Sequence, residues 1–252
     1  MMRILAPICL CAFPALAQEL APTVSSTPPS AYTTPQILNG QTPLPAKSAL
    51  GLRDTLRVTD AEYQACLSEL DGYSVTYSEL KPIIAPDDPD CGILRPLQVT
   101  AIAKGVAVEP PATLRCEAAA SLARWTHDFV LPAGSRLKNR GALSALENGS
   151  GYVCRRRTNA PDGKLSEHGV GNAFDIMGFR FADDTRIAIQ PREADGTLEE
   201  AFQDAVRASA CLEFSTVLGP GSNASHADHL HLDVISRKTG YRLCEQGGVM
   251  SE

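Results

Sequence analysis

The chain lacks a hydrophobic run long enough to span a membrane as a helix. Its main apolar stretch, near the N-terminus, is shorter than the roughly 20 residues that a membrane-spanning helix needs, and no later segment is long enough. Positive charge is also scarce, since 23 Lys and Arg residues stand against 29 Asp and Glu residues. This mildly acidic balance argues against binding to nucleic acid or to an anionic membrane surface.

The N-terminal residues have the pattern of a secretory signal peptide. Arg3 precedes the apolar run ILAPICLCAFPAL, and the small-residue cleavage pattern ALA ends at Ala17. We therefore expect residues 1–17 to be removed by cleavage near Ala17 and Gln18. The mature protein would then be periplasmic or secreted.

The cysteines are even in number after that cleavage, and none of them forms a CxxC pair. The six that remain are Cys66, Cys91, Cys116, Cys154, Cys211 and Cys244. An even number of cysteines in an exported chain predicts disulfide bonds, but the many possible pairings leave the connectivity open. The absence of CxxC disfavours a zinc site made of cysteines.

The rest of the chain divides into a tether, one domain and a short tail. Residues 18–53 are rich in Pro, Ser, Thr and Ala and contain few large apolar residues, which predicts a solvated, partly extended tether. Residues 54–246 are long enough to bury one hydrophobic core. Residues 247–252 form the tail, and no segment of the chain repeats another.

Short strand-like runs alternate irregularly with a few helical patterns. Thr59 and Glu62 form a capping box, which predicts a helix ending at Leu70. Apolar residues at spacings of three or four predict helices over 111–131 and 197–210. The second helix is expected to face inward with Leu198, Phe202, Ala205, Val206 and Ser209. Strands are expected over 72–77, 150–157, 174–179 and 213–218. This pattern predicts an α+β domain in which helices pack on a mainly antiparallel sheet.

Two short segments, SEHGVGNAFD (166–175) and HADHLHLD (226–233), contain four of the five histidines. The second segment alternates polar and apolar residues, so His229, His231 and Asp233 would share one face of a strand. The first supplies His168 and Asp175, with glycines that permit a tight backbone path between them. One carboxylate and two or three imidazoles suit a zinc ion, and three protein ligands plus water is the catalytic arrangement. His127 lies off the apolar stripe of its predicted helix and is expected at the surface.

These two segments resemble the signature of a group of zinc folds. SEHGVGNAFD is similar to the SxHxxGxAxD motif of the lysostaphin, D-Ala-D-Ala peptidase and hedgehog (LAS) group, and HADHLHLD to its closing HxH. The closest resemblance is to the bacterial extensin-like C-terminal domain, whose opening is similar to C-x-x-x-L, GYSVTY and CGILRPLQV of this chain. A more distant one is to the penicillin-insensitive murein endopeptidases, which share HxxHxH. The resemblance implies an LAS-type, disulfide-stabilised fold over 54–246.

The resemblance also implies roles for individual residues. His168, Asp175 and His231 match the metal ligands, and His229 matches the residue that assists the water or the tetrahedral intermediate. His226 matches the first histidine of HxxHxH, where a substrate-side role and a loop-stabilising role both stay open. Arg155 is the candidate cation for an oxyanion or a substrate carboxylate, although an inserted Val-Cys leaves the register of that segment open.

Several neighbouring residues keep alternative assignments. Asp228 and Asp233 are equal candidates for accepting an imidazole N–H. The hydroxyl of Ser166 is expected to hold its loop, and Glu167 is an alternative base whose side chain would point away from its neighbour. Finally, the resemblance implies a Cys66–Cys91 disulfide.

Together these features predict an exported zinc peptidase. It would bind one Zn²⁺ and hydrolyse amide bonds of peptidoglycan stem peptides or cross-links through a metal-bound water. Endopeptidase and carboxypeptidase action, D,D and L,D bonds, and the oligomeric state stay open. The alternative hypothesis is a non-catalytic, zinc-containing module that binds the cell wall, because a set of metal ligands alone does not establish turnover.

Overall fold

The computed structural model describes residues 51–138, 140–157, 163–191, 193 and 196–245. The predicted signal peptide, nearly all of the tether and the tail lie outside these residues and stay predictions. A membrane-spanning helix needs a longer and more apolar sequence than any helix of the described residues has.

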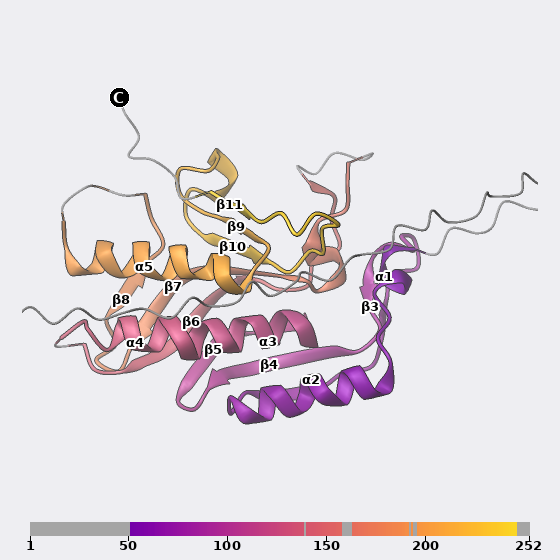
Figure 1. The fold of residues 1–252 in the computed structure, drawn as a ribbon, viewed down its shortest axis with the longest axis horizontal. Coiled ribbons are helices and arrows are strands. Elements are labelled where there is room, and N and C mark those ends of the chain that lie inside the picture. The colour runs from indigo at the N-terminus through magenta and orange to yellow at the C-terminus, as the bar shows by residue number, and fades with distance from the viewer. Residues whose placement is uncertain (1–50, 139, 158–162, 192, 194–195, 246–252) are drawn as a thin grey trace, which may run out of the picture. The chain divides into compact units, whose positions relative to one another are not determined.

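A sheet of nine strands forms the framework of the described residues (Figure 1). The strand order is β1-β4-β5-β6-β7-β10-β9-β11, and β8 pairs with the second half of β7. The pairs β5–β6 and β9–β11 are parallel and the other pairs antiparallel. The strands are β1 Thr76–Glu79, β4 Pro96–Ala103, β5 Val106–Arg115, β6 Leu143–Ser150, β7 Ala173–Phe181, β8 Arg186–Ala188, β9 Thr216–Leu218, β10 Leu230–Asp233 and β11 Leu243–Cys244, with β2 Ile83–Ile84 and β3 Gly92–Ile93 forming a separate small sheet. The predicted α+β class with a mainly antiparallel sheet is confirmed.

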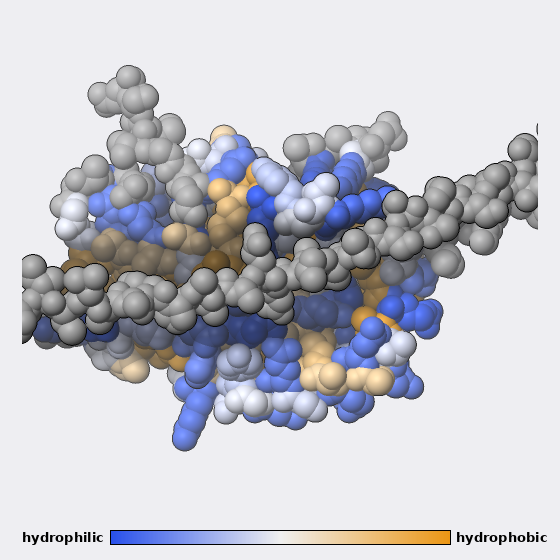
Figure 2. Space-filling view, viewed as in Figure 1, coloured by the Kyte–Doolittle hydropathy of each residue, from blue (hydrophilic) through white to orange (hydrophobic). Residues whose placement is uncertain are grey.

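Helices cover one face of the large sheet. In Figure 1, α2 (Asp60–Gly72), α3 (Cys116–Trp125) and α5 (Leu198–Glu213) lie side by side in front of the strands. A π-helical turn (Thr126–Val130) and α4 (Leu131–Gly134) continue α3, and α1 (Leu52–Thr55) precedes α2. Hydrophilic side chains cover much of the face shown in Figure 2, as expected when amphipathic helices turn their apolar sides to a sheet.

Two of the predicted helices begin or face differently from expectation. The prediction for 111–131 is wrong at its start, because residues up to Arg115 complete β5, where Leu114 pairs with Leu97 of β4. In α5, Leu198 is exposed to 62%, since it occupies the first turn beyond the edge of the core. Ala205 is also exposed, whereas the predicted core residues Phe202 and Val206 are buried.

The capping box is present as predicted. Thr59 Oγ1 accepts from the Glu62 amide at 3.2 Å, and the Glu62 carboxylate accepts from the Thr59 amide at 2.8 Å. The helix continues to Gly72, two residues beyond the expected end. Among the predicted strands, 150–157 is wrong, since β6 ends at Ser150 and Cys154 lies in an irregular segment.

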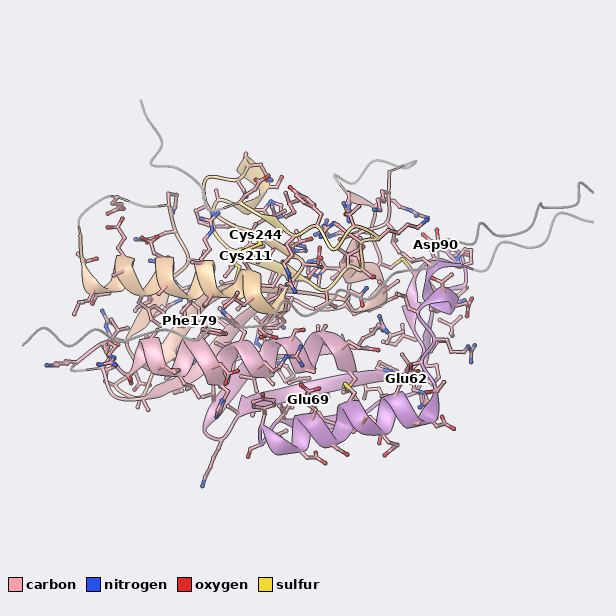
Figure 3. The ribbon with its side chains drawn as sticks, viewed as in Figure 1. Glu62, Glu69, Asp90, Phe179, Cys211 and Cys244 are labelled. Atoms are coloured by element: carbon pink, nitrogen blue, oxygen red, sulfur yellow. A yellow bond between two sulfur atoms is a disulfide. The ribbon has the colours of Figure 1, made fainter. Side chains whose placement is uncertain are left out.

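Three disulfides connect the six described cysteines, as the even count predicted. The pairs are Cys66–Cys116, Cys91–Cys154 and Cys211–Cys244, the last of which is labelled in Figure 3. The expected Cys66–Cys91 bond is wrong. Cys66 lies on α2 opposite the first residue of α3, with a Cα–Cα distance of 6.2 Å to Cys116, so helix packing selects its partner.

Aromatic residues hold the helices on the sheet. The ring of Phe179 on β7, labelled in Figure 3, lies between the helices and the sheet. It is 6.4 Å from the ring of Trp125 on α3 and 5.0 Å from that of Phe202 on α5. Trp125 is fully buried, and its indole N–H donates to the Val206 carbonyl at 3.0 Å. This cluster is therefore the junction of the three elements.

We expect Phe179→Ala to lower the free energy of unfolding by about 3–5 kcal/mol, because it opens a cavity in this cluster. The matched change Leu198→Ala on exposed α5 surface should alter it by no more than about 0.5 kcal/mol. Urea unfolding of the two variants measures both values. A loss below about 1 kcal/mol for Phe179→Ala would contradict the assigned role of the cluster.

Candidate metal centre

The pairing of β7 with β10 places Asp175 directly opposite His231. On both strands the neighbours of these residues, Phe174 and Ile176 on β7 and Leu230 and Leu232 on β10, belong to the hydrophobic core. Since successive side chains of a strand point to opposite faces, Asp175 and His231 lie on the sheet face away from the helices. The alternation predicted for the HADHLHLD segment is present.

A short 3₁₀ helix, η3 (Glu167–Val170), brings His168 to the same place. It ends at Gly171, whose φ of 71° is a left-handed conformation that favours glycine. A Cβ at this position would lie 2.3 Å from Cδ1 of Ile93. The tight path between His168 and β7 therefore requires glycine at position 171.

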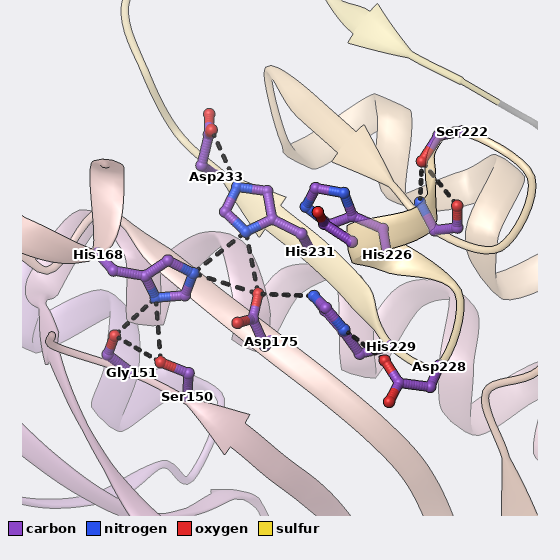
Figure 4. A network of polar contacts seen from close by, with 12 residues as sticks. Ser150, Gly151, His168, Asp175, Ser222, His226, Asp228, His229, His231 and Asp233 are labelled. Atoms are coloured by element: carbon purple, nitrogen blue, oxygen red, sulfur yellow. Dashed lines mark hydrogen bonds and ion pairs between the residues drawn. The ribbon is translucent and has the colours of Figure 1, made fainter. Parts of the chain in front are cut away.

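The three predicted ligands converge on one point (Figure 4). His168 Nε2 lies 3.2 Å from Asp175 Oδ1 and 3.1 Å from His231 Nδ1, and His231 Nδ1 lies 2.9 Å from Asp175 Oδ1. Bonds of about 2 Å in tetrahedral geometry place neighbouring ligand atoms about 3.3 Å apart. The spacing of the three atoms thus fits a small divalent ion, and these residues can hold one.

The outer nitrogen of each imidazole is already engaged. His168 Nδ1 lies 2.7 Å from the Gly151 carbonyl, and His231 Nε2 lies 3.3 Å from Asp233 Oδ2. A carbonyl and a carboxylate accept, so in the neutral rings these outer nitrogens carry the protons and the inner nitrogens carry lone pairs. The Gly151 carbonyl is a partner that sequence reasoning missed, and no side-chain pattern signals a backbone acceptor.

The charges at the site favour a cation between the three ligand atoms. Burial disfavours an ionised Asp175, but the contacts of its carboxylate with His168 and His231 outweigh this effect and hold the pKa of Asp175 well below its ordinary value. Burial likewise opposes protonation of His231, yet Asp175 and Asp233 raise the pKa of His231 to about 9. Without a metal, His231 therefore carries a proton at neutral pH.

His229 stands beside the three ligand residues. Its Nδ1 lies 3.0 Å from Asp228 Oδ1, and its Nε2 lies 3.9 Å from Asp175 Oδ1. Asp228 thus holds Nδ1 as the donor and leaves Nε2 as an acceptor that faces the site. Asp228 and Asp233 were equal candidates for accepting an imidazole N–H, and both do so. Asp233 accepts from His231, and Asp228 accepts from His229.

His226 and Arg155 complete the surroundings. The His226 ring lies 5.1 Å from that of His229, and its Nδ1 lies 2.7 Å from Asn223 Oδ1, a partner the sequence did not suggest. Burial, together with the nearby charges of His231, His229 and Arg155, lowers the pKa of His226 to about 4. Arg155 is exposed and close enough to influence His226.

Arg156 and Arg157, which follow Arg155 directly, pair with carboxylates outside the group of three metal-binding residues. Arg156 pairs with Asp88 at 2.7 Å, and Arg157 lies 3.6 Å from Glu167. Glu167 is buried and accepts from Asn172 Nδ2, and it is not a member of the metal-binding group. Ser166 is buried too, and its carbonyl accepts from the Gly169 amide. The expected surface position of His127 is confirmed by its 59% exposed side chain.

The metal-free protein should lose stability as the pH rises from about 6.5 to about 9. The raised pKa of His231 stabilises the folded state fully below its ordinary value of 6.5, and this contribution disappears as the pH passes about 9. The loss should reach up to about 3 kcal/mol. Urea unfolding with a chelator, compared with His231→Asn, measures it. A wild-type profile parallel to that of the variant contradicts the assignment.

Comparison with known proteins adds one match. The family model described as the extensin-like protein C-terminus matches residues 64–245, well over half of the chain. No curated protein and no solved structure matches the chain. With its match extending from α2 to the end of β11, the chain belongs to the extensin-like C-terminal family.

Proposed function

We propose that the protein is an exported zinc peptidase that hydrolyses amide bonds of peptidoglycan stem peptides or cross-links. The observation that carries the proposal is the convergence of His168 Nε2, Asp175 Oδ1 and His231 Nδ1 within 3.2 Å of one another. Their outer hydrogen bonds orient the two imidazoles for binding a cation, an arrangement typical of metal-ligating histidines.

The donor set favours zinc among the common divalent ions. Two imidazole nitrogens and one carboxylate oxygen suit zinc, whereas calcium and magnesium prefer sites made of oxygen. All six described cysteines are in disulfides, so thiolates do not compete for the ion. Zinc, when bound by three protein ligands, lowers the pKa of a coordinated water to about 7 and polarises carbonyl groups.

The residues around the three ligands supply the remaining chemistry. Nε2 of His229, held as an acceptor by Asp228, is suited to take a proton from the attacking water and return it to the leaving amine. His226, with its lowered pKa, is neutral at pH 7 and can accept a hydrogen bond from the substrate. Arg155 supplies a positive charge for a developing oxyanion or a substrate carboxylate.

The choice of peptidoglycan rests on resemblance. SEHGVGNAFD and HADHLHLD are similar to the SxHxxGxAxD and HxxHxH motifs of the LAS zinc peptidases and the murein endopeptidases. Three disulfides are typical of proteins outside the reducing cytosol, where peptidoglycan also lies.

Two histidine substitutions should separate metal binding from turnover. We expect His231→Ala to abolish tight zinc binding and the release of fragments from sacculi. His229→Ala should keep its zinc while losing release by about 10²- to 10⁴-fold, the usual contribution of acid–base catalysis. Metal content and muropeptide profiles of digested sacculi measure both effects.

The control is His127→Ala, an exposed histidine on the opposite face, which should retain both properties. The peptidase proposal would be contradicted if folded, zinc-loaded wild-type protein released nothing from sacculi and cleaved no member of a full panel of muropeptides. Retained binding of that protein to sacculi would instead favour a non-catalytic cell-wall module.

A further inference from the structure

Asn172 makes four hydrogen bonds that connect three separate segments. Its Oδ1 accepts from Arg115 Nη1 at 2.8 Å, and its Nδ2 donates to Glu167 Oε2 at 2.9 Å. Its amide donates to the Glu167 carbonyl at 3.0 Å, and its carbonyl accepts from the Val234 amide at 3.2 Å. The side chain is buried, with 4% of the residue exposed.

Two of the segments bonded to Asn172 carry one of the three metal-binding residues, and Asn172 itself leads into the strand that carries the third. Glu167 precedes His168 on η3, Asn172 itself lies just before β7, which carries Asp175, and Val234 directly follows β10, which carries His231. Hydrogen bonds from this one residue therefore set the spacing between the three ligand-bearing segments.

Arg115 connects Asn172 and the turn before it to the large sheet. Its amide donates to the Gly171 carbonyl at 2.9 Å, and its guanidinium donates to the Leu56 carbonyl and to Glu117 at 3.1 and 2.7 Å. The guanidinium is largely buried, with 14% of its side chain exposed. Because Arg115 is the last residue of β5, the turn that bears His168 is fastened to the large sheet.

Stability alone does not explain this arrangement. Burying Arg115 and Glu167 costs desolvation energy, and well-packed apolar residues of similar volume often stabilise a fold as well or better. Directional bonds do what apolar packing does not, since they fix the orientation of a turn to within a narrow range. That property matters where three ligand atoms must stay within 3.2 Å of one another.

We propose that Asn172, through its paired bonds to Glu167 and Arg115, is a positioning residue that sets the affinity of the centre for its metal. The proposal rests on the metal site of the proposed function but not on the identity of the substrate. It assigns a role to a residue that is neither a ligand nor a participant in the chemistry.

A reciprocal exchange of amide and carboxylate tests the pairing. Asn172→Asp keeps the acceptor for Arg115 but removes the donor to Glu167, which leaves two carboxylates facing each other. We expect its zinc affinity, measured by chelator competition at pH 7.5, to fall by about 10- to 100-fold. The double variant Glu167→Gln with Asn172→Asp restores a donor and an acceptor in reversed order at unchanged net charge. Its affinity should return to within about threefold of wild type.

A matched change elsewhere separates positioning from general stability. Asn148→Asp also converts an asparagine whose Nδ2 donates, but this side-chain bond runs from β6 to the Pro110 carbonyl of β5 and not between η3, β7 and β10. We expect it to lower the unfolding midpoint of the metal-free protein without changing the zinc affinity. If Asn172→Asp does not fold, Asn172→Ser takes its place with the same expected loss of affinity.

Unchanged affinity in the folded Asn172 variant overturns the proposal, and so does a double variant that folds but stays as weak as the single one. Wild-type protein that does not bind zinc overturns the proposed function and this inference together. A zinc-binding wild type with unaffected variants overturns the inference alone.

Discussion

Three lone pairs meet at the centre of the site, and much of its surroundings follows from that constraint. The inner nitrogens of His168 and His231 and Oδ1 of Asp175 lie within 3.2 Å of one another. Their outer nitrogens already have acceptors, so neither neutral ring can place a proton between them. A proton on His231 or a bound metal ion removes the repulsion among these three lone pairs. The same positive charge offsets the cost of burying the Asp175 carboxylate.

The two faces of one sheet allow this polar centre to exist beside a stable core. Along β10, Leu230 and Leu232 enter the core while His231 and Asp233 turn to the opposite face. Burial of apolar side chains between the helices and the sheet offsets the free-energy cost of burying polar side chains on the other face. The strands that carry the ligands are thus held rigidly by contacts on their other side, which is how a site of this kind keeps its spacing.

Local patterns in the sequence predicted the site better than they predicted long-range pairing. The period of two in HADHLHLD and the glycines of SEHGVGNAFD indicate which side chains share a face and where the chain turns, and the resemblance to known zinc motifs then selects His168, Asp175 and His231, which the structure brings together. Cys66 pairs with Cys116 because α2 packs on α3, and no spacing in the sequence encodes that contact. The hydrogen bonds of the Gly151 carbonyl and of the Asn172 side chain could not be predicted either, because their partners come from distant segments.

An aspartate pairs with a histidine twice along one segment, and solvent access distinguishes the two pairs. Asp233, with 3% of its side chain exposed, holds His231, whereas Asp228, with 77% exposed, holds His229. The buried pair is shielded from water, so its electrostatic preference for a cation is strong and its geometry is fixed. In the second pair only the Asp228 carboxylate is largely exposed, since 18% of the His229 side chain is accessible, so this pair is worth little to stability but reaches solvent through Asp228. Binding suits the first pair and proton transfer the second, which supports the division of roles proposed for His231 and His229.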